Sequence, residues 1–359
     1  MVALEDGITM SQPTIHKGRR MSRARCYLGP VRRRSSLVIR ANELARALTF
    51  DGKKCTGVSY SVNGTEHIAL AGREVIVSAG SINSPQMLEL SGIGNPELLK
   101  DQGIEVVHAL KGVGENLRDH YAPRFKWSVP RRHGLTYNVH GRGLRLIGQG
   151  LKYAVSGTGL IGLSSGPIRA FVRTRDGLDA PNAMIMWLPF LIGEQMTSLE
   201  KESGVSAAAH ALRPESTGSV HITSNDGAAA PAIRFNFLSA ALDREITLDV
   251  AKLLREIMKA PALADIVDGE LAPGPGVVSD DEIMDWARMA GATCFHPVGT
   301  CKMGSDPMAV VDERLRVHGI SGLRVADASI MPTLTSGNTN APSIMIGEKA
   351  ARMVLEDRA

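Results

Sequence analysis

The chain has 359 residues and a formal net charge of +4, with 43% hydrophobic and 4% aromatic residues. This length favours two or more domains with sizeable cores. No run of about 18 apolar residues occurs, as a transmembrane helix would require, and the acids Glu5 and Asp6 stand where a signal peptide would have its apolar segment. We therefore expect a cytoplasmic protein, with peripheral membrane contact left open.

The N-terminal segment carries a dense positive charge. Such a run is typical of nucleic-acid binding or targeting, or of a solvated or phosphate-facing element. Eight cations occur there with no acid among them: Lys17, Arg19, Arg20, Arg23, Arg25, Arg32, Arg33 and Arg34.

Strand signals dominate the next part of the chain. Residues 36–40 are strand-like and run on through Ala41 to Leu44. Residues 56–62 and 66–70 alternate as strands around Asn63-Gly64, a dipeptide that predicts a hairpin turn.

A strand and a helix follow, and then the pattern changes. Residues 74–78 form a short apolar strand, and a helix starts at Pro85 and ends at Ser91-Gly92. From about Tyr121 to Ala290 the pattern is a mixture of helices and antiparallel strands. The clearest elements there are strands at 219–223 and 232–236 and a helix at 242–260.

Three short motifs fail the context that their chemistry needs. Gly157-Thr158-Gly159-Leu160-Ile161-Gly162 matches the dinucleotide pattern, but no convincing strand precedes it and Pro167 interrupts the following helix. The segment 162–166 matches the G-x-S-x-G elbow of hydrolases, again without its strand and helix. Cys294, His296 and Cys301 could be drawn as zinc ligands, but a fourth is not evident, so we expect no metal and read the cysteines as buried thiols.

A histidine and an asparagine near the C-terminus are the candidate catalytic residues. His296 lies in a Pro-Val-Gly-Thr turn, and its unperturbed pKa of roughly 6.5 suits a general base near neutral pH. Asn338 lies in a loop of small polar residues before an apolar-periodic helix. We expect Asn340 to be the N-cap of that helix and Pro342 to lie in its first turn, so that its positive end could face an electron-rich group.

Four segments, in this order, resemble the glucose-methanol-choline (GMC) oxidoreductases, a family of FAD-dependent alcohol oxidases and dehydrogenases. The similarity is closest to the choline and alcohol dehydrogenase branch and covers nearly the whole chain. The segments are Gly80-Ser81-Ile82-Asn83-Ser84-Pro85-Gln86-Met87-Leu88-Glu89-Leu90-Ser91-Gly92-Ile93-Gly94, His296-Pro297-Val298-Gly299-Thr300-Cys301-Lys302-Met303-Gly304, Gly322-Leu323-Arg324-Val325-Ala326-Asp327-Ala328-Ser329 and Ser336-Gly337-Asn338-Thr339-Asn340-Ala341-Pro342.

The resemblance implies a fold of α/β plus α+β class. It predicts an incomplete Rossmann-like FAD-binding domain at 1–120 and 291–359, lacking the family's N-terminal βαβ unit. A substrate-binding domain built on an antiparallel sheet is inserted at 121–290. The apolar segment 184–190 falls where the family places sheet residues beneath the substrate, although it also reads as plain core. The basic segment matches a family helix, so we expect no nucleic-acid partner.

The resemblance also implies site residues, cofactor and reaction. His296 matches the base that removes the hydroxyl proton, and Asn338 matches the group that hydrogen-bonds the substrate oxygen, while a hydride passes to flavin N5. Five residues match FAD contacts: Leu44 at the adenine, Asp327 and Ala328 near the phosphates and ribityl chain, and Thr339 and Asn340 beside the flavin pyrimidine.

The expected activity is oxidation of a primary alcohol to an aldehyde. Choline is the alternative substrate, although the chain has few aromatic residues and no acid near the apolar segment before Glu194 with which to hold a quaternary ammonium. The electron acceptor is open, and a complementary N-terminal fragment is a possible partner. The alternative of another class is a non-catalytic fragment of the family that cannot hold FAD alone.

Overall fold

A computed structural model describes residues 6–162, 166–193 and 198–357. Their contacts divide the chain into two units. The sheet unit comprises Tyr121–Leu212, Leu242–Ala292 and the described part of Met1–Ile39. The site unit comprises Arg40–His120, Arg213–Ala241 and the described part of Thr293–Ala359.

This division differs from the predicted ranges in three places. Residues 291–292 join the sheet unit, where β17 (Gly291–Thr293) pairs with β10 (Tyr121–Ser128), and backbone pairing also explains the other two differences. Residues 6–39 join the sheet unit because β1 (Gly7–Met10) pairs antiparallel with β11 (Ile168–Val172). Residues 213–241 join the site unit because Leu117 and Gly218 form an antiparallel bridge. The chain passes from the site unit to the sheet unit after His120.

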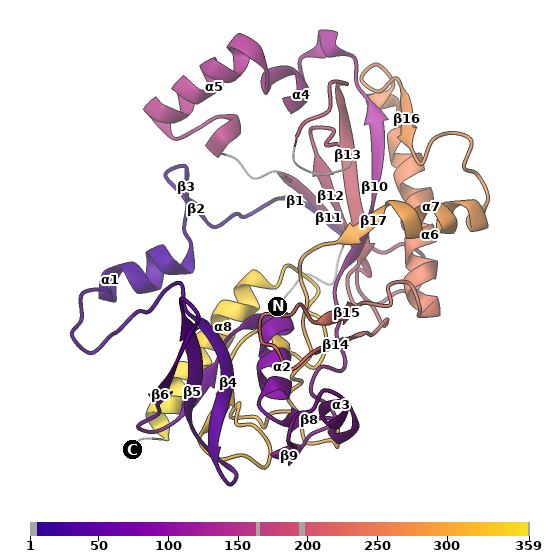
Figure 1. Cartoon of the computed structure of the whole chain (residues 1–359). Coiled ribbons are helices and arrows are strands. Elements are labelled where there is room, and N and C mark those ends of the chain that lie inside the picture. Colours follow the sequence, from indigo (N-terminus) through magenta and orange to yellow (C-terminus); the bar gives the residue numbers. More distant parts are fainter. Residues whose placement is uncertain (1–5, 163–165, 194–197, 358–359) are drawn as a thin grey trace. The chain divides into compact units, whose positions relative to one another are not determined.

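The sheet unit is built on a seven-stranded sheet in the order β1-β11-β12-β13-β10-β16, with β17 also paired to β10. Its helices α6 and α7 pack on one face, as Figure 1 shows. The further strands are β10 (Tyr121–Ser128), β12 (Ala183–Leu188), β13 (Gly204–Ala211), β16 (Gly269–Ala272) and β17 (Gly291–Thr293), with the short pair β2 (Ile15–His16) and β3 (Arg19–Arg20) outside the sheet. The helices are α1 (Gly29–Val31), α4 (Tyr137–His140), α5 (Gly143–Ser156), α6 (Ala241–Met258) and α7 (Asp280–Ala290).

The alternation of strand side chains decides which face of this sheet is the core. Phe125 and Trp127 of β10 are 1% and 2% exposed, and they pack with Leu254 of α6 and Ile283 of α7. Because neighbouring side chains on a strand point to opposite faces, Arg124 and Lys126 lie on the other face. The predicted antiparallel sheet is therefore present, with the aromatic residues of β10 on the face that α6 and α7 cover and its two cations on the other.

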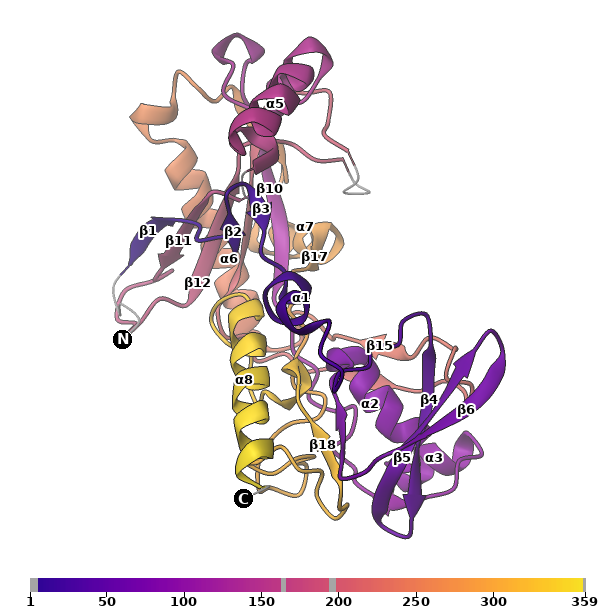
Figure 2. The ribbon, with the colours of Figure 1, turned by 90° about the vertical axis from the view of Figure 1, so that its left-hand side faces the viewer.

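The site unit combines a hairpin sheet with two short parallel strand pairs. Figure 2 shows α2 and the β4-β5-β6 sheet on one side of β18 and α8 on the other. Its strands are β4 (Leu44–Asp51), β5 (Lys54–Val62), β6 (Thr65–Leu70), β7 (Val75–Val77), β8 (Ile93–Gly94), β9 (His108–Ala109), β14 (Ser219–His221), β15 (Ala232–Arg234) and β18 (Leu323–Val325). Its helices are α2 (Gly80–Leu90), α3 (Pro96–Asp101) and α8 (Asn340–Glu356).

Parallel pairing in the described residues of this unit consists of two short ladders and the isolated bridges Lys54–Ser321 and Met303–Val311. The pairs are β7 with β18 and β8 with β9. The Asn63-Gly64 hairpin is confirmed, since Val62 pairs with Thr65, and β14 and β15 pair antiparallel as predicted. The mixture of helices, antiparallel sheets and short parallel pairs agrees with the predicted α/β plus α+β class.

Three local predictions were wrong. Residues 36–40 form no strand, because no neighbouring segment pairs with them, and the strand begins at Leu44. Helix α2 begins at Gly80 rather than Pro85. The N-cap of α8 is Thr339, and Asn340 is already the first helical residue.

Candidate functional site

His296 and Asn338, 42 positions apart in the sequence, are in contact in the site unit. The Nε2 atom of His296 lies 2.6 Å from Nδ2 of Asn338. His296 is 9% exposed, and Asn338 is half-buried at the end of the loop that leads into α8. The two predicted catalytic side chains are therefore brought together.

A second histidine, which the sequence reading missed, touches the other nitrogen of His296. The Nδ1 atom of His120 lies 3.0 Å from Nδ1 of His296, and the two rings meet edge to face with centroids 5.2 Å apart. His120 is fully buried. Its sequence signal, a Leu-Arg-Asp-His run directly before β10, is too short to identify it without the fold.

Asp119 holds the backbone around both histidines. Its carboxylate accepts a hydrogen bond of 2.9 Å from the N–H of His296 and another from the hydroxyl of Thr293. Burial raises the pKa of the Asp119 carboxyl, against hydrogen bonds from Thr293 and from the backbone N–H groups of His296 and His120 that lower it. This buried carboxylate thus joins two segments that are far apart in the sequence.

The segments carrying His120 and His296 are paired by their backbones. Arg118 and Val298 form an antiparallel bridge, with N–H to O distances of 3.0 and 2.9 Å. The N–H of Cys294 donates to the carbonyl of His120 at 2.9 Å. This pairing fixes the two imidazoles in register.

The start of α2 supports the loop that follows His296. Proline at position 85 has no N–H, so the carbonyl of Ser81, four residues earlier, lacks its usual partner in the helix. The hydroxyl of Thr300 donates to that carbonyl at 2.7 Å, and the hydroxyl of Ser81 donates to the carbonyl of Pro297 at 2.6 Å. The proline thus frees an acceptor through which α2 is hydrogen-bonded to the loop that follows His296.

Asp327 also binds the start of α2. Its Oδ2 accepts from the N–H of Gly80 at 2.9 Å and from the hydroxyl of Ser84 at 2.5 Å. Its Oδ1 accepts from the N–H of Ser329 at 2.8 Å. Gly80 has φ of +82°, a conformation that favours glycine. The described bonds of this carboxylate are therefore internal to the fold.

The remaining predicted cofactor residues lie in different parts of the site unit. Leu44 opens β4 and is 42% exposed, and Ala328 is half-buried after Asp327. Thr339 is 9% exposed, and Asn340 is exposed. Only Thr339 and Asn340 adjoin the His296–Asn338 pair, through the chain itself.

The described residues contain no group of three or more histidine, cysteine or acidic side chains that could hold a metal. Burial raises the pKa of the Cys301 thiol well above its usual value. Cys26, in contrast with the predicted burial of the cysteines, is exposed. The G-x-G-x-x-G motif follows helix α5 instead of a strand, and positions 163–165 of the G-x-S-x-G motif lie outside the described residues.

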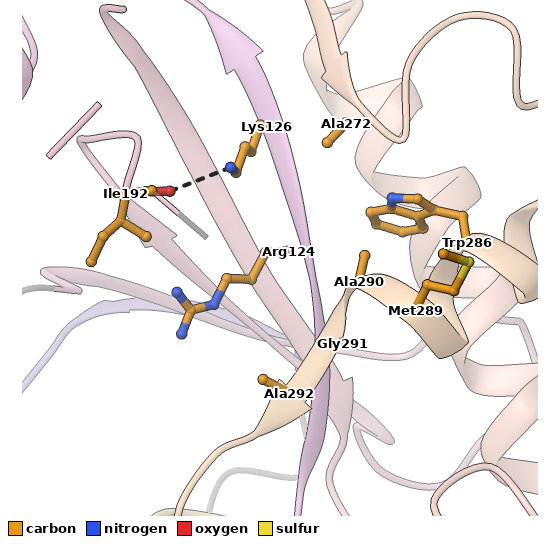
Figure 3. A pocket seen from close by; sticks show the side chains of 10 residues that line it. Arg124, Lys126, Ile192, Ala272, Trp286, Met289, Ala290, Gly291 and Ala292 are labelled. Carbon is orange, nitrogen blue, oxygen red and sulfur yellow. Dashed lines mark hydrogen bonds between the residues drawn. The ribbon is translucent and has the colours of Figure 1, made fainter. Parts of the chain in front are cut away.

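A cavity of about 530 Å³ lies in the sheet unit, on the side of β10 that carries Arg124 and Lys126. Figure 3 shows Arg124, Lys126 and Ile192 on one side of the view and Trp286 and Met289 of α7 on the other. Lys126 donates to the Ile192 carbonyl at 3.3 Å and pairs with Glu200 at 2.7 Å. None of the predicted catalytic or cofactor residues lines this cavity.

Models of the GMC oxidoreductase family match residues 5–122 and 214–347. The chain is 40% identical to an oxygen-dependent choline dehydrogenase of Chromohalobacter salexigens over 335 residues, which is 93% of the chain and 60% of that relative. It is 40% identical to an oxygen-dependent choline dehydrogenase of Pseudomonas fluorescens over 344 residues, 95% of the chain and 60% of the relative. The chain thus spans about 60% of the length of these curated relatives.

Solved structures agree with these matches. A formate oxidase superposes with a TM-score of 0.90 at 25% identity, covering 98% of the chain and 66% of that protein. Pyridoxine 4-oxidase from Mesorbium loti superposes with a TM-score of 0.81 at 28% identity, covering 96% and 64%. Together with the family models, these similarities show that the chain belongs to the GMC oxidoreductase family.

Proposed function

We propose that this chain carries the catalytic residues of a FAD-dependent enzyme that oxidises a primary alcohol to an aldehyde. His296 takes the hydroxyl proton at Nε2, and Asn338 hydrogen-bonds the alcohol oxygen as negative charge develops on it. FAD, when bound, accepts the hydride of the α-carbon at N5. The observation that carries the proposal is the 2.6 Å contact between these two side chains.

The start of α8 fits the pyrimidine end of a flavin. Its N-cap Thr339 makes no side-chain cap hydrogen bond, and the first turn contains no acidic residue. The positive end of the helix dipole is therefore not neutralised by a local carboxylate, and it favours an electron-rich carbonyl nearby. Thr339 and Asn340 would hold this part of the cofactor, with Leu44, Asp327 and Ala328 as the further proposed contacts.

Two substrate classes are to be compared, an uncharged primary alcohol and choline. The sparse aromatic composition supports the first. The names of the curated relatives support the second, and they also support dioxygen as an electron acceptor. Both substrates are primary alcohols, so the roles of His296 and Asn338 are the same for each.

A complementary N-terminal segment that supplies the βαβ unit is part of the proposal. Apolar residues of the site unit support it, because Ile68 and Leu70 of β6 are 62% and 81% exposed and Ile76 of β7 is 44% exposed. Exposed apolar strand residues are typical of surfaces that another segment covers. The alternative is a non-catalytic fragment that cannot hold FAD.

Co-expression separates these alternatives. We expect the chain purified with the N-terminal βαβ segment of a choline dehydrogenase relative to retain flavin absorbance and to reduce a redox dye when an alcohol is added. The chain alone should retain less flavin. Dye reduction with ethanol, butanol and choline then ranks the substrates. Absence of both flavin retention and alcohol-dependent dye reduction in the co-expressed sample would support the non-catalytic alternative.

We further propose peripheral membrane contact through α5. None of the described helices is long and apolar enough to cross a bilayer. Helix α5 nevertheless exposes an apolar stripe of Leu144 (86%), Ile147 (60%), Leu151 (65%) and Val155 (89%). Residues 121–175 contain ten lysines and arginines and no acid. An exposed apolar stripe with flanking cations is typical of helices that lie on anionic lipid surfaces.

Vesicle co-sedimentation tests the α5 surface. We expect the chain to bind vesicles containing phosphatidylglycerol, and the double change Ile147→Ser with Leu151→Ser to weaken binding roughly tenfold or more. Ile68→Ser, at a residue of β6 with similar exposure, is the matched control. Equal binding by the double variant and the control would exclude α5 as the contact.

A further inference from the structure

We propose that His120 is a positioning residue that fixes the protonation state of His296, so that its Nε2 is ready to accept the substrate proton. The inference rests on the proposed role of His296 as the base. It adds a partner on the far side of the imidazole that the four family segments in the sequence did not indicate.

The contacts of His296 restrict its proton to two possible assignments. A neutral imidazole carries one proton, so of two Nδ1 atoms 3.0 Å apart one donates and the other accepts. In the assignment in which the Asn338 amide donates to Nε2 of His296, that nitrogen has no proton. The proton of His296 then lies on Nδ1 and is donated to Nδ1 of His120, whose own proton is on Nε2.

A competing assignment inverts this arrangement. If the Asn338 amide is rotated so that its oxygen faces His296, Nε2 carries the proton and His120 becomes the donor. His296 could not then act as a base at Nε2 without first losing that proton. The two assignments thus predict opposite protonation of the same ring.

The surroundings hold His120 in a fixed position beside His296. It is fully buried, and its carbonyl accepts from the N–H of Cys294 at 2.9 Å. Asp119, the preceding residue, binds the backbone of His296 at 2.9 Å. When Nε2 takes a proton, the Nδ1–H of the resulting imidazolium still has a buried partner, and hydrogen bonds to charged groups are stronger than those to neutral ones. His120 therefore raises the proton affinity of His296 as well as orienting it.

Nitrogen NMR on the chain itself, labelled with ¹⁵N-histidine, tests the assignment without flavin. The signals of His296 are identified from their loss in H296Q. We expect wild-type His296 to carry its proton on Nδ1. His120→Phe removes the acceptor, and should shift His296 toward the Nε2–H form and lower its affinity for a proton roughly 10-fold or more. His120→Gln, whose side-chain oxygen can accept, should largely restore the wild-type signals.

The matched control is His67→Gln, on exposed strand β6. It should leave the His296 signals unchanged. If wild-type His296 carries its proton on Nε2, or if His120→Phe lowers stability without changing the protonation of His296, then His120 is only a core residue and the proposal is wrong.

The flavin-containing complex supplies a second readout. His120→Phe should lower the limiting rate of flavin reduction at neutral pH roughly 10- to 100-fold, move the acid limb of its pH profile to lower pH, and leave KM little changed. His120→Gln should recover most of the rate. If the NMR result holds but loss of His296 itself does not slow reduction, the proposed function fails while the positioning contact stands.

Discussion

His296→Ala is expected to retain flavin in the complemented complex and to lower the rate of alcohol-driven flavin reduction roughly 10²- to 10⁴-fold, the usual effect of removing a general base. The side chain is buried, and its Nε2 meets Asn338, so nearby water is a poor substitute for it. Stopped-flow absorbance under anaerobic conditions measures the change directly, because the flavin bands bleach on reduction.

The control for this variant must keep the fold and change a histidine elsewhere. His67→Ala on β6 meets this condition, since its side chain is exposed and lies in the hairpin sheet. We expect near-wild-type reduction from it. A near-normal rate of flavin reduction in His296→Ala would show that His296 is not the base. If that variant loses its flavin absorbance, the reduction rate is measured on His296→Gln instead.

The sequence pointed to His296 and Asn338 as candidate residues because each lies in a local pattern. His296 is followed by a proline and glycine turn, and Asn338 precedes a periodic helix with Pro342 in its first turn. Such signals depend on residues a few positions away, and a sequence displays them directly. The approach of the two side chains came from the family resemblance, because the residues between them do not encode it.

His120 and Asp119 could not be found in that way. Their roles depend on the pairing of Arg118 with Val298, which joins segments 180 positions apart. Neither segment alternates as a regular strand, and the pairing consists of an isolated bridge with a few flanking hydrogen bonds. The buried carboxylate and the second imidazole become recognisable only when this bridge places them beside His296.

The local predictions were likewise correct where neighbouring residues set the structure and wrong where a distant partner was needed. The Asn63-Gly64 hairpin was predicted correctly because its turn conformation is set by two residues, both with positive φ. Residues 36–40 have strand propensity, but a strand also needs a partner. Pro85 was predicted to start a helix because proline is common in the first turn of helices. It lies inside α2 instead, and the hydroxyl of Thr300 donates the hydrogen bond to Ser81 that the proline cannot.

Asp327→Ala is expected to lower the free energy of unfolding of the chain by about 3 kcal/mol or more. The carboxylate accepts three hydrogen bonds, from Gly80, Ser84 and Ser329. Hydrogen bonds to charged groups each contribute about 1.5–3 kcal/mol, and the sum is reduced because neighbouring contributions are not additive. Urea unfolding followed by far-ultraviolet circular dichroism measures the change on the chain without any cofactor.

Two control variants show whether the loss of stability in Asp327→Ala comes from its hydrogen bonds. Asp327→Asn keeps one acceptor oxygen and should lose less stability than Asp327→Ala. Asp306→Ala, at an exposed carboxylate paired with Lys302, should leave stability nearly unchanged, because exposed ion pairs contribute little. Equal stability of the Asp327 and Asp306 variants would show that the contacts to α2 contribute little. A large loss of stability measured without flavin would instead show that the Asp327 side chain stabilises the start of α2. The backbone of Asp327 would remain available for the proposed contact with FAD. Because the same turn of α2 binds the loop after His296 through Ser81, the loss of these contacts should also disorder that loop.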